Sequence, residues 1–343
     1  MKKKLLTMFL ALILCAGFTA VPTFACTSFA VYSDQVIYGK NFDYSDSGIN
    51  LSSCALQITG GVKTFQVQLS MPMGTGYDAT MNEDGLFSCI NQVNPPSLSP
   101  GDFDMTGFVT VTNTVEDVNA VKNILTKSTV GNMYGSYHLL FADPSGNAVV
   151  LENNGQLTQT PINGKYIVMT NFYNSTLQGK SYTDAEGVGA DRYIIACQNI
   201  EANFKTFDVD AAFDTLQKTI QSSTHFSVVG DPANQVVYLA IHQNYGQIWK
   251  ISLKDETVET YRGFQKPVIF NLHGTDVYFQ TLMDYQIDGT ITGVDPANYS
   301  FPKSPGLSWI WWTAGAVVIA AAGACIGLLI WKRAKRSRQA SSR

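Results

Sequence analysis

Charge and histidine are both scarce in this sequence. Only 15% of its 343 residues are charged, four are histidines, and no internal repeat or low-complexity run interrupts it. Hydrophobic residues make up 45% of the chain and aromatic residues 12%, so the chain can bury a substantial core. This composition excludes a disordered chain and a coiled coil.

Basic residues are sparse in the body of the chain. Nine of the 23 lysines and arginines lie at the two ends, and all 27 acidic residues lie between them. The body therefore keeps 14 basic residues and a charge of about −13, although the whole chain carries only −4. Such an acidic body argues against a nucleic acid as partner.

The segment 1–25 has the layout of a secretory signal peptide. Three lysines open it, an apolar run follows, and small residues surround Ala25. Cleavage after Ala25 would leave Cys26 as the first residue of the mature protein. A lipoprotein signal is the alternative, but Thr23 and Phe24 stand where lipidation of Cys26 favours an aliphatic residue and a small one.

The segment 307–331 is an uncharged apolar run of 25 residues. At about 1.5 Å per residue it is long enough to cross about 30 Å of hydrocarbon. Tryptophans mark both of its ends and the basic tail 332–343 follows, so we predict a single membrane span with the tail in the cytoplasm and the body outside the cell. Gly323 and Gly327 could join two spans in a homo-oligomer, although one such pair in an Ala/Gly-rich run is mostly chance.

No CxxC metal pattern and no nucleotide or flavin motif occurs, so we expect neither a metal nor another cofactor. Outside the two terminal apolar runs the chain keeps four cysteines: Cys26, Cys54, Cys89 and Cys197. Four thiols allow three pairings, which leaves the disulfide status open. Cys89 and Cys197 stand within apolar runs, and this favours buried free thiols at both positions.

Between the ends we predict one large domain, residues 26–292, followed by a proline-containing stalk at 293–306. Patterns typical of strands dominate the domain, beginning with a hairpin formed by Thr27 to Tyr32 and Gln35 to Lys40. The other expected strands are Thr64 to Leu69, Gly85 to Val93, His138 to Ala142, Ala148 to Glu152, Tyr166 to Met169, Phe226 to Val229, Val236 to His242 and Gln247 to Leu253. Their number predicts a large antiparallel β component.

Three segments have helical periodicity: Val115 to Lys127, Gly189 to Asn203 and Val209 to Gln221. For the first of them we expect Thr114 as the N-cap, with the acidic residues Glu116 and Asp117 in the first turn. Antiparallel strands combined with a few helices indicate an α+β fold built of packed layers.

An amino-terminal cysteine has a specific chemical use. Its thiolate can attack a carbonyl while its own α-amine, with an ordinary pKa of about 7.7 to 8.0, moves the proton without any histidine. The four histidines stand in no recognisable Cys-His motif, so a papain-like assignment has no support. An ordinary cysteine at the start of a strand is the alternative interpretation of Cys26.

The residues around Cys26 carry a resemblance. The run Cys26-Thr27-Ser28-Phe29 and the run from Gly39 to Asp43, Gly-Lys-Asn-Phe-Asp, resemble the opening of the choloylglycine hydrolase family of linear amide C–N hydrolases. An out-and-back hairpin of this length returns Lys40 to the vicinity of Cys26. There a cation favours the thiolate, and the Asp43 carboxylate can accept from the α-ammonium.

Four further blocks follow in the order that this family has them. Met81 to Leu86, together with Asn91, is similar to its MNExGL block, and His138 to Glu152 is similar to its central hairpin. Val168 to Asn171 matches its V-x-T-N, and Gly189 to Tyr193 resembles its later arginine segment. The resemblance thus spans about Cys26 to Tyr193, and it implies a four-layer αββα sandwich of the N-terminal nucleophile hydrolase type.

The resemblance also implies roles for individual residues. Cys26 would be the nucleophile and, through its α-amine, the general base and acid. Asp43 would hold that amine, and Arg192 would brace Cys26 and Asp43. Asn171, by its side-chain amide, and Asn91, by its backbone or side chain, would donate to the oxyanion, where one well-placed donor contributes roughly 3 kcal/mol.

The scarcity of arginine supports the role of Arg192, and a lysine in place of the family's usual arginine bears on the role of position 40. Arg192 and Arg262 are the only arginines between Cys26 and the predicted span. Lys40 stands where the family usually has arginine; it keeps the charge but loses the planar fork that could brace a thiolate and a substrate carbonyl together. We expect the histidines of the strand regions, His138 and His225, to be structural.

The sequence therefore predicts a hydrolase that cleaves the linear amide of a small N-acyl amine through an acyl-enzyme on Cys26, on the outer face of a bacterial membrane. The substrate class stays open among conjugated bile salts, phenoxyacyl penicillins and other N-acyl amines. Two alternatives remain, an acyltransferase on the same scaffold and a non-catalytic surface receptor in which Lys40 marks a decayed site.

Overall fold

A computed structural model describes residues 25–44, 52–59, 61–71, 74–93, 100–131, 136–152, 155–159 and 164–288. The chain divides into two compact units, Met1–Ala297 and Asn298–Arg343, and every described residue belongs to the first. The predicted stalk, membrane span and basic tail, and the signal peptide except Ala25, lie outside the described residues. Among the described helices, none is long and apolar enough to span a bilayer.

Two eight-stranded sheets, each antiparallel throughout, form the centre of the unit. Sheet A has the strand order β12-β1-β2-β13-β14-β15-β16-β17. Its strands are β1 Thr27–Tyr32, β2 Val36–Asp43, β12 Tyr166–Met169, β13 Thr224–Asp231, β14 Val236–Ile241, β15 Ile248–Ser252, β16 Thr257–Arg262 and β17 Ile269–Asn271.

Sheet B has the strand order β11-β10-β9-β6-β5-β4-β3-β18. Its strands are β3 Ser53–Thr59, β4 Val62–Met71, β5 Gly74–Asn82, β6 Phe87–Gln92, β9 Tyr137–Ala142, β10 Ala148–Leu151, β11 Leu157–Gln159 and β18 Val277–Tyr278. A separate parallel pair joins β7 Phe103–Asp104 to β8 Val130–Gly131.

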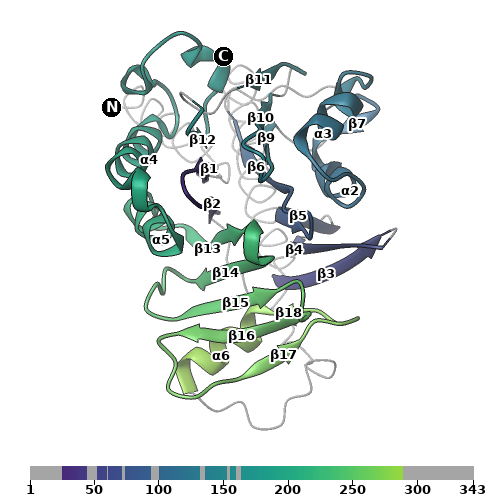
Figure 1. Cartoon of the computed structure of the whole chain (residues 1–343), viewed down its shortest axis with the longest axis vertical. Helices are drawn as coiled ribbons and strands as arrows, with labels where there is room; N and C mark the ends of the chain where they lie inside the picture. The colour runs from purple at the N-terminus through teal and green to yellow at the C-terminus, as the bar shows by residue number, and fades with distance from the viewer. Residues whose placement is uncertain are drawn as a thin grey trace, which may run out of the picture. The chain divides into compact units, whose positions relative to one another are not determined.

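Helices cover the outer face of each sheet, as Figure 1 shows. Helices α4 Ala190–Asn203 and α5 Val209–Lys218 lie on sheet A, and α2 Phe108–Thr112 and α3 Val118–Leu125 lie on sheet B. Helix α6 Phe279–Asp288 follows β18. Short 3-10 turns lie at Met105–Gly107, Asn174–Leu177, Tyr182–Asp184, Phe204–Thr206 and Pro232–Asn234.

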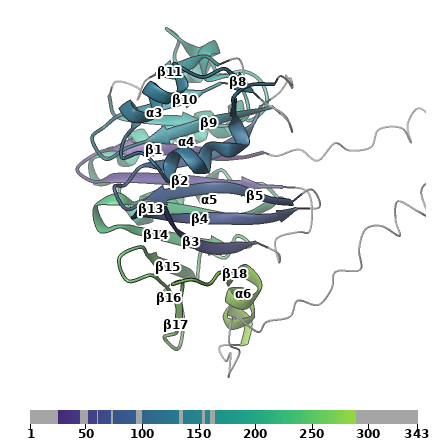
Figure 2. The ribbon, with the colours of Figure 1, turned by 90° about the vertical axis from the view of Figure 1, so that its right-hand side faces the viewer.

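Three buried apolar clusters correspond to the three interfaces of these layers. The first joins inward residues of both sheets, such as Met169 and Phe226 from sheet A and Met81 and Leu140 from sheet B. The second lies between sheet A and helices α4 and α5, and the third between sheet B and helices α2 and α3. The described part of the chain is therefore a four-layer αββα sandwich, and the predicted α+β class is confirmed (Figure 1). Figure 2 views the same layers from the side of α3, with β3, β4 and β5 of sheet B in view.

The opening hairpin forms where the sequence predicts it, and β2 runs three residues further than expected, to Asp43. Strand alternation explains both strands, since Ala30 and Tyr38 face sheet B while Phe29 and Ile37 face α4 and α5. Both strands are central in sheet A, because β1 pairs with β12 and β2 pairs with β13. The start of β1 and the end of β2 thus lie side by side at one end of a rigid layer.

One helix start is wrong in the prediction. Helix α3 begins at Val118 rather than Val115, and its N-cap is Asp117, whose carboxylate accepts from the Ala120 N–H at 2.7 Å. Thr114 instead donates its hydroxyl hydrogen back to the carbonyls that end α2. A carboxylate satisfies the free N–H groups of a first turn at least as well as a hydroxyl, so Asp117 sets the boundary.

Candidate active site

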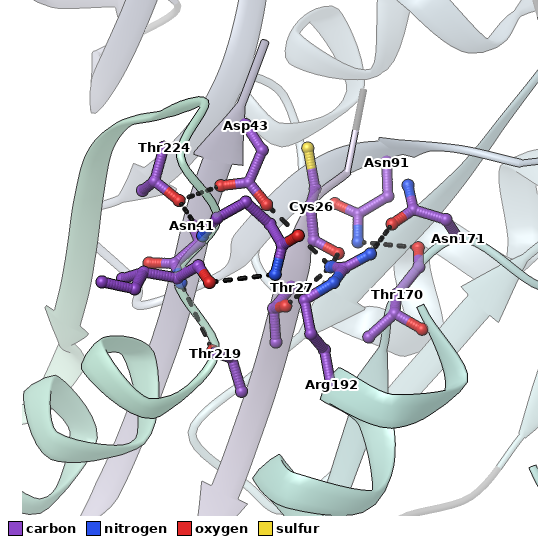
Figure 3. A network of polar contacts seen from close by, with 12 residues as sticks. Cys26, Thr27, Asn41, Asp43, Asn91, Thr170, Asn171, Arg192, Thr219 and Thr224 are labelled. Atoms are coloured by element: carbon purple, nitrogen blue, oxygen red, sulfur yellow. Dashed lines mark hydrogen bonds and ion pairs between the residues drawn. The ribbon is translucent and has the colours of Figure 1, made fainter. Parts of the chain in front are cut away.

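Cys26 lies at the entrance to β1, almost completely buried. The register of the hairpin pairs Thr27 with Asn41, and the backbone N–H of Ala25 donates to the Asp43 carbonyl at 3.3 Å. The peptide bond between Ala25 and Cys26 therefore lies opposite the end of β2. In Figure 3 the Cys26 sulfur projects between Asp43 and Asn91.

Arg192 holds the main chain of this cysteine from the first turn of α4. Its Nη1 donates to the Cys26 carbonyl and, at 3.0 Å, to the Thr27 hydroxyl, while Nη2 donates to Asn171 Oδ1 at 2.7 Å (Figure 3). The Arg192 side chain is only 4% exposed. Gly189, the N-cap of α4, has φ +79°, and a Cβ there would stand 2.5 Å from Arg192 Nη2, so the helix start must be glycine for the guanidinium to fit.

Asp43 has one satisfied and one unsatisfied carboxylate oxygen. Oδ1 accepts a hydrogen bond from the Thr224 hydroxyl. Oδ2 is buried, has no hydrogen-bond partner among the described residues, and lies 4.0 Å from Arg192 Nη1. Burial raises the pKa of Asp43 to about 6, although Thr224, Arg192 and Lys40 oppose that rise. A cationic donor next to Oδ2 would remove most of this penalty.

Lys40 approaches Cys26 from inside the sandwich and is fully buried. Its Nζ donates to the Ile90 carbonyl at 2.9 Å and to Asn91 Oδ1 at 2.7 Å, and its charge acts on the nearby Cys26 thiol. Asp78 Oδ1 lies 3.2 Å from the same nitrogen. Burial alone would lower the pKa of Lys40, but Asp78 and the two thiols nearby raise it above its ordinary value. Lys40 is therefore a charged lysine held by two hydrogen bonds and one ion pair.

Asn91 uses its whole side chain to connect the two sheets. Its Oδ1 accepts from Lys40 and from the Ser28 hydroxyl, and its Nδ2 donates to the Met169 and Thr170 carbonyls, both at 3.0 Å. Both amide hydrogens of Asn91 therefore have acceptors in this arrangement. Its backbone N–H lies in the ladder of β6 with β9, where Asn91 pairs with His138 in the register in which the Val93 N–H donates to the Ser136 carbonyl. The oxyanion role of Asn91 stays a prediction from the resemblance.

Asn171 follows β12 and faces Asn91 across the site. Its Oδ1 accepts from Arg192, which fixes the orientation of the amide, and its Nδ2 donates to the Gln92 carbonyl at 2.7 Å. His138 Nε2 lies 2.7 Å from the Thr170 carbonyl, and burial lowers the pKa of this histidine to about 3. His138 thus has the structural position expected of it, as part of the support beneath Asn171. His225 lies beside Tyr44, whose carbonyl oxygen is 2.6 Å from its Nε2.

The electrostatics leave Cys26 protonated. Burial raises the pKa of its thiol to about 11; Lys40 opposes the rise, while Asp78 and Asp43 add to it. The expectation that Lys40 favours the thiolate holds only for its own contribution, since burial outweighs that contribution. A base that takes the thiol proton is therefore required for attack at neutral pH.

The six residues predicted for the site all lie in one network, but sequence patterns missed four of its members: Thr27, Ser28, Asp78 and Thr224. Asp78 is missed for a structural reason. In the pairing of β4 with β5, Gln66 faces Thr80 and Gln68 faces Tyr77, so Asp78 and Ala79 together oppose a single residue. Such a β-bulge breaks strict alternation and turns Asp78 toward Lys40.

All four cysteines of the described residues are free and buried, which confirms the expectation for Cys89 and Cys197. Burial raises the pKa of Cys89 to about 12. Within the described residues no cluster of three or more metal-ligating side chains occurs.

Comparison with solved structures identifies the fold. Crystal structures of two variants of the conjugated bile acid hydrolase from Clostridium perfringens superpose with TM-scores of 0.51 and 0.52 at 16% and 17% sequence identity. Each alignment covers 69% of this chain, and 96% or 97% of the hydrolase. The penicillin V acylase from Agrobacterium tumefaciens has a TM-score of 0.49 at 16% identity, covering 68% of this chain and 90% of the acylase.

No protein-family model and no curated protein sequence matches the chain. The likeness to the bile acid hydrolase thus gives the fold, and it agrees with the family that the sequence motifs resemble.

Proposed function

We propose that this protein is an amidohydrolase of the choloylglycine hydrolase type, in which Cys26 becomes the amino-terminal nucleophile once residues 1–25 are removed. The observation that carries the proposal is the buried, unpartnered Oδ2 of Asp43, on the strand end that lies opposite the bond between Ala25 and Cys26. Cleavage of that bond creates an α-ammonium beside Asp43. A cation with three donors is the group that a buried, unsatisfied carboxylate oxygen accommodates best.

The α-amine also supplies the missing base. The thiol of Cys26 stays protonated at neutral pH, and no histidine of the described residues is among the groups that act on its pKa. An α-amine with a pKa near 8 can take the thiol proton and form a thiolate–ammonium pair. Asp43 then stabilises the ammonium, and Arg192 keeps the Cys26 carbonyl in place while the proton moves.

Acyl transfer follows from this arrangement. The sulfur attacks the amide carbonyl, and the oxyanion accepts from the Asn171 side-chain amide. Collapse of the tetrahedral intermediate breaks the C–N bond, with the α-ammonium returning its proton to the leaving amine. Water, deprotonated by the same amine, then hydrolyses the thioester and regenerates the thiol.

The substrate that fits this chemistry is a linear amide of a small N-acyl amine. The solved relatives are named for conjugated bile acids and for penicillin V, two chemically different N-acyl compounds. Placement of the site on the outer face of a membrane rests on the leader and apolar run at the two ends of the sequence.

Amine release by the mature protein tests the proposal. The protein is purified from membranes and incubated with conjugated bile salts, phenoxymethylpenicillin and N-acyl amino acids, and free amine is quantified. Turnover of at least one class is expected to fall by more than 100-fold in Cys26→Ser. It should fall similarly when one alanine is retained before Cys26, because the α-amine is then an amide.

Cys54→Ala is the matched control, since Cys54 is also a buried free cysteine but lies in β3. It should keep parental turnover. An enzyme that retains the extra alanine and still works at the parental rate would show that the α-amine is not the base.

A further inference from the structure

The β-bulge in β5 delivers a buried carboxylate to the interior of the site. Asp78 is 1% exposed and fully enclosed between the sheets. Neither of its oxygens has a hydrogen-bond partner among the described residues, and Lys40 Nζ lies 3.2 Å from Oδ1 as an ion pair. A carboxylate with so little support is costly to bury, and a regular strand would have turned it away from Lys40.

Among the described residues Lys40 is the only close partner of this carboxylate, and it also lies near the nucleophile. Its ammonium lies 3.2 Å from Asp78 Oδ1, and its charge lowers the pKa of the Cys26 thiol. The same ammonium orients Asn91, which in turn holds the carbonyls that precede Asn171. The ion pair of Lys40 with Asp78 therefore influences both the Cys26 thiol and the orientation of Asn91 and of the segment that precedes Asn171.

We infer that Asp78 is a positioning residue that neutralises Lys40 and thereby keeps the Cys26 thiol protonated until the α-amine removes its proton. The inference rests on the proposed function for its catalytic meaning. An unneutralised ammonium beside the sulfur would stabilise the thiolate, and nucleophilicity falls as the pKa of a thiol falls. With Asp78 beside it, Lys40 keeps its orienting hydrogen bond to Asn91, but its charge lowers the pKa of the Cys26 thiol less than an unpaired ammonium would.

Other charged and titratable groups also lie near Cys26. They come from β2, α4, β6 and β9, and they are Asp43, Arg192, Cys89 and Tyr137. Of these four, Asp43 raises the pKa of the Cys26 thiol. Among the described residues Asp78 forms an ion pair with Lys40 and its oxygens accept no hydrogen bond, so substitution of Asp78 changes one charge and leaves the others in place.

The test measures the thiol directly. The mature protein is alkylated with iodoacetamide between pH 6 and pH 10, and the rate is followed at the Cys26 peptide by mass spectrometry. In Asp78→Asn the alkylation profile is expected to move down by about one pH unit, which is about a tenfold faster reaction at pH 7.5. Asp78→Ser also removes the charge but places a smaller side chain beside Lys40. It should shift the alkylation profile in the same direction.

Two further variants are the controls for the alkylation test. Asp78→Glu keeps the charge and should keep the parental profile, whereas Asp84→Asn removes an exposed acid from the turn after the same strand and should change nothing. A folded Asp78→Asn or Asp78→Ser protein with the parental profile overturns the inference. If neither of these folds, a shifted profile in Asp78→Glu overturns it and a parental one supports it.

The outcome is separable from that of the proposed function. If the protein hydrolyses no amide but the alkylation profile still shifts, the proposed function fails and the link from Asp78 to Cys26 stands. If amides are hydrolysed and the alkylation profile does not shift, the proposed function stands and the link from Asp78 to Cys26 fails.

Discussion

Two buried cations flank Cys26, and they serve it differently. Arg192, on the side of α4, binds the cysteine by its carbonyl and orients Asn171, and the nearest carboxylate oxygen is 4.0 Å away. Lys40, which points toward sheet B, acts on the thiol through its charge, and its carboxylate partner lies at 3.2 Å. The arginine thus fixes the main chain, and the neutralised lysine governs the thiol.

This difference follows from the geometry of the two side chains. The planar guanidinium reaches three acceptors that lie in one fork, whereas the compact ammonium serves acceptors arranged around a point. Arg192 also leaves an Asp43 oxygen unpaired, which suits an arriving α-ammonium. Lys40 instead stands 3.2 Å from its carboxylate, and it donates to the Ile90 carbonyl and to Asn91 Oδ1.

The largest effect is expected from loss of the arginine. Arg192→Met leaves the Cys26 carbonyl and Asn171 Oδ1 without their donor and Asp43 without its nearest cation, so turnover should be lost. The free energy of unfolding should fall by about 3–5 kcal/mol, the usual cost of breaking a buried charged network. Urea unfolding and amine release measure the two quantities.

The other arginine of the body is the control for this substitution. Arg262 pairs with Asp210 at the surface, where the two side chains are 39% and 69% exposed. Arg262→Met should therefore cost less than about 1 kcal/mol and leave turnover unchanged. Equal losses in the two variants would remove the distinction between a site arginine and a surface arginine.

The lysine should matter nearly as much to stability. Lys40→Met leaves Asp78 buried without a counter-charge, so we expect a loss of about 3 kcal/mol at pH 7, measured by urea unfolding. Lys250→Met is the control, because Lys250 pairs with Glu259 while both are more than a quarter exposed.

A second substitution shows whether the ion pair itself stabilises the fold. In Lys40→Met combined with Asp78→Leu both charges are gone, and stability should recover to within about 1 kcal/mol of the parent while turnover stays low. A double variant as unstable as Lys40→Met alone would show that packing, rather than the uncompensated Asp78, causes the loss.

The pH dependence of stability should carry the signature of Asp78. Burial raises the pKa of its carboxyl to about 6 against the opposing effect of Lys40. The folded state then holds this proton more tightly than the unfolded state, whose aspartates titrate near 3.9. The contribution of Asp78 to stability is therefore greatest below about pH 4 and is lost as the pH rises through 6.

Removal of the Asp78 carboxyl should reduce the dependence of the unfolding free energy on pH between about pH 4 and pH 6. The difference in unfolding free energy between Asp78→Asn and the parent should change by about 2 kcal/mol from pH 4 to pH 7, in favour of the variant at the higher pH. Urea unfolding at four pH values measures it. A difference that does not vary with pH would contradict the raised pKa.

The smallest effect is expected at the glycine beside the arginine. Gly189→Ala places a methyl group 2.5 Å from Arg192 Nη2 and a non-glycine residue at φ +79°, so the guanidinium must shift. We expect a loss of about 1–2 kcal/mol in stability and a fall in turnover of about tenfold. Gly179→Ala, also at positive φ but with nothing near its added Cβ, should cost stability without the fall in turnover.

The sequence could predict what depends on local pattern. Alternation in the first hairpin predicts its register, and that register brings Lys40 and Asp43 to Cys26. Arginine is rare between Cys26 and the predicted span, which singles out Arg192, and Arg192 lies in the polar network around Cys26. Sequence could not predict the contact of Thr224 with Asp43, because 181 residues separate them and only the pairing of β2 with β13 joins them.

Asp78 lay beyond prediction for a different reason. Regular alternation along β5 gives neighbouring residues opposite faces, and a bulge places Asp78 and Ala79 against one residue of β4. The shift of the α3 cap from Thr114 to Asp117 is a local competition between two good caps, which only the packing of α3 on sheet B decides.

The central claim is that Cys26 is an amino-terminal nucleophile, and intact mass of the mature protein tests it most directly. The protein is weighed before and after a brief incubation with a slowly hydrolysed N-acyl amide. The account predicts a mass that begins at unmodified Cys26, and one acyl adduct that is absent from Cys26→Ser. A chain that retains residues before Cys26, or an adduct that persists in the serine variant at another side chain, would contradict it.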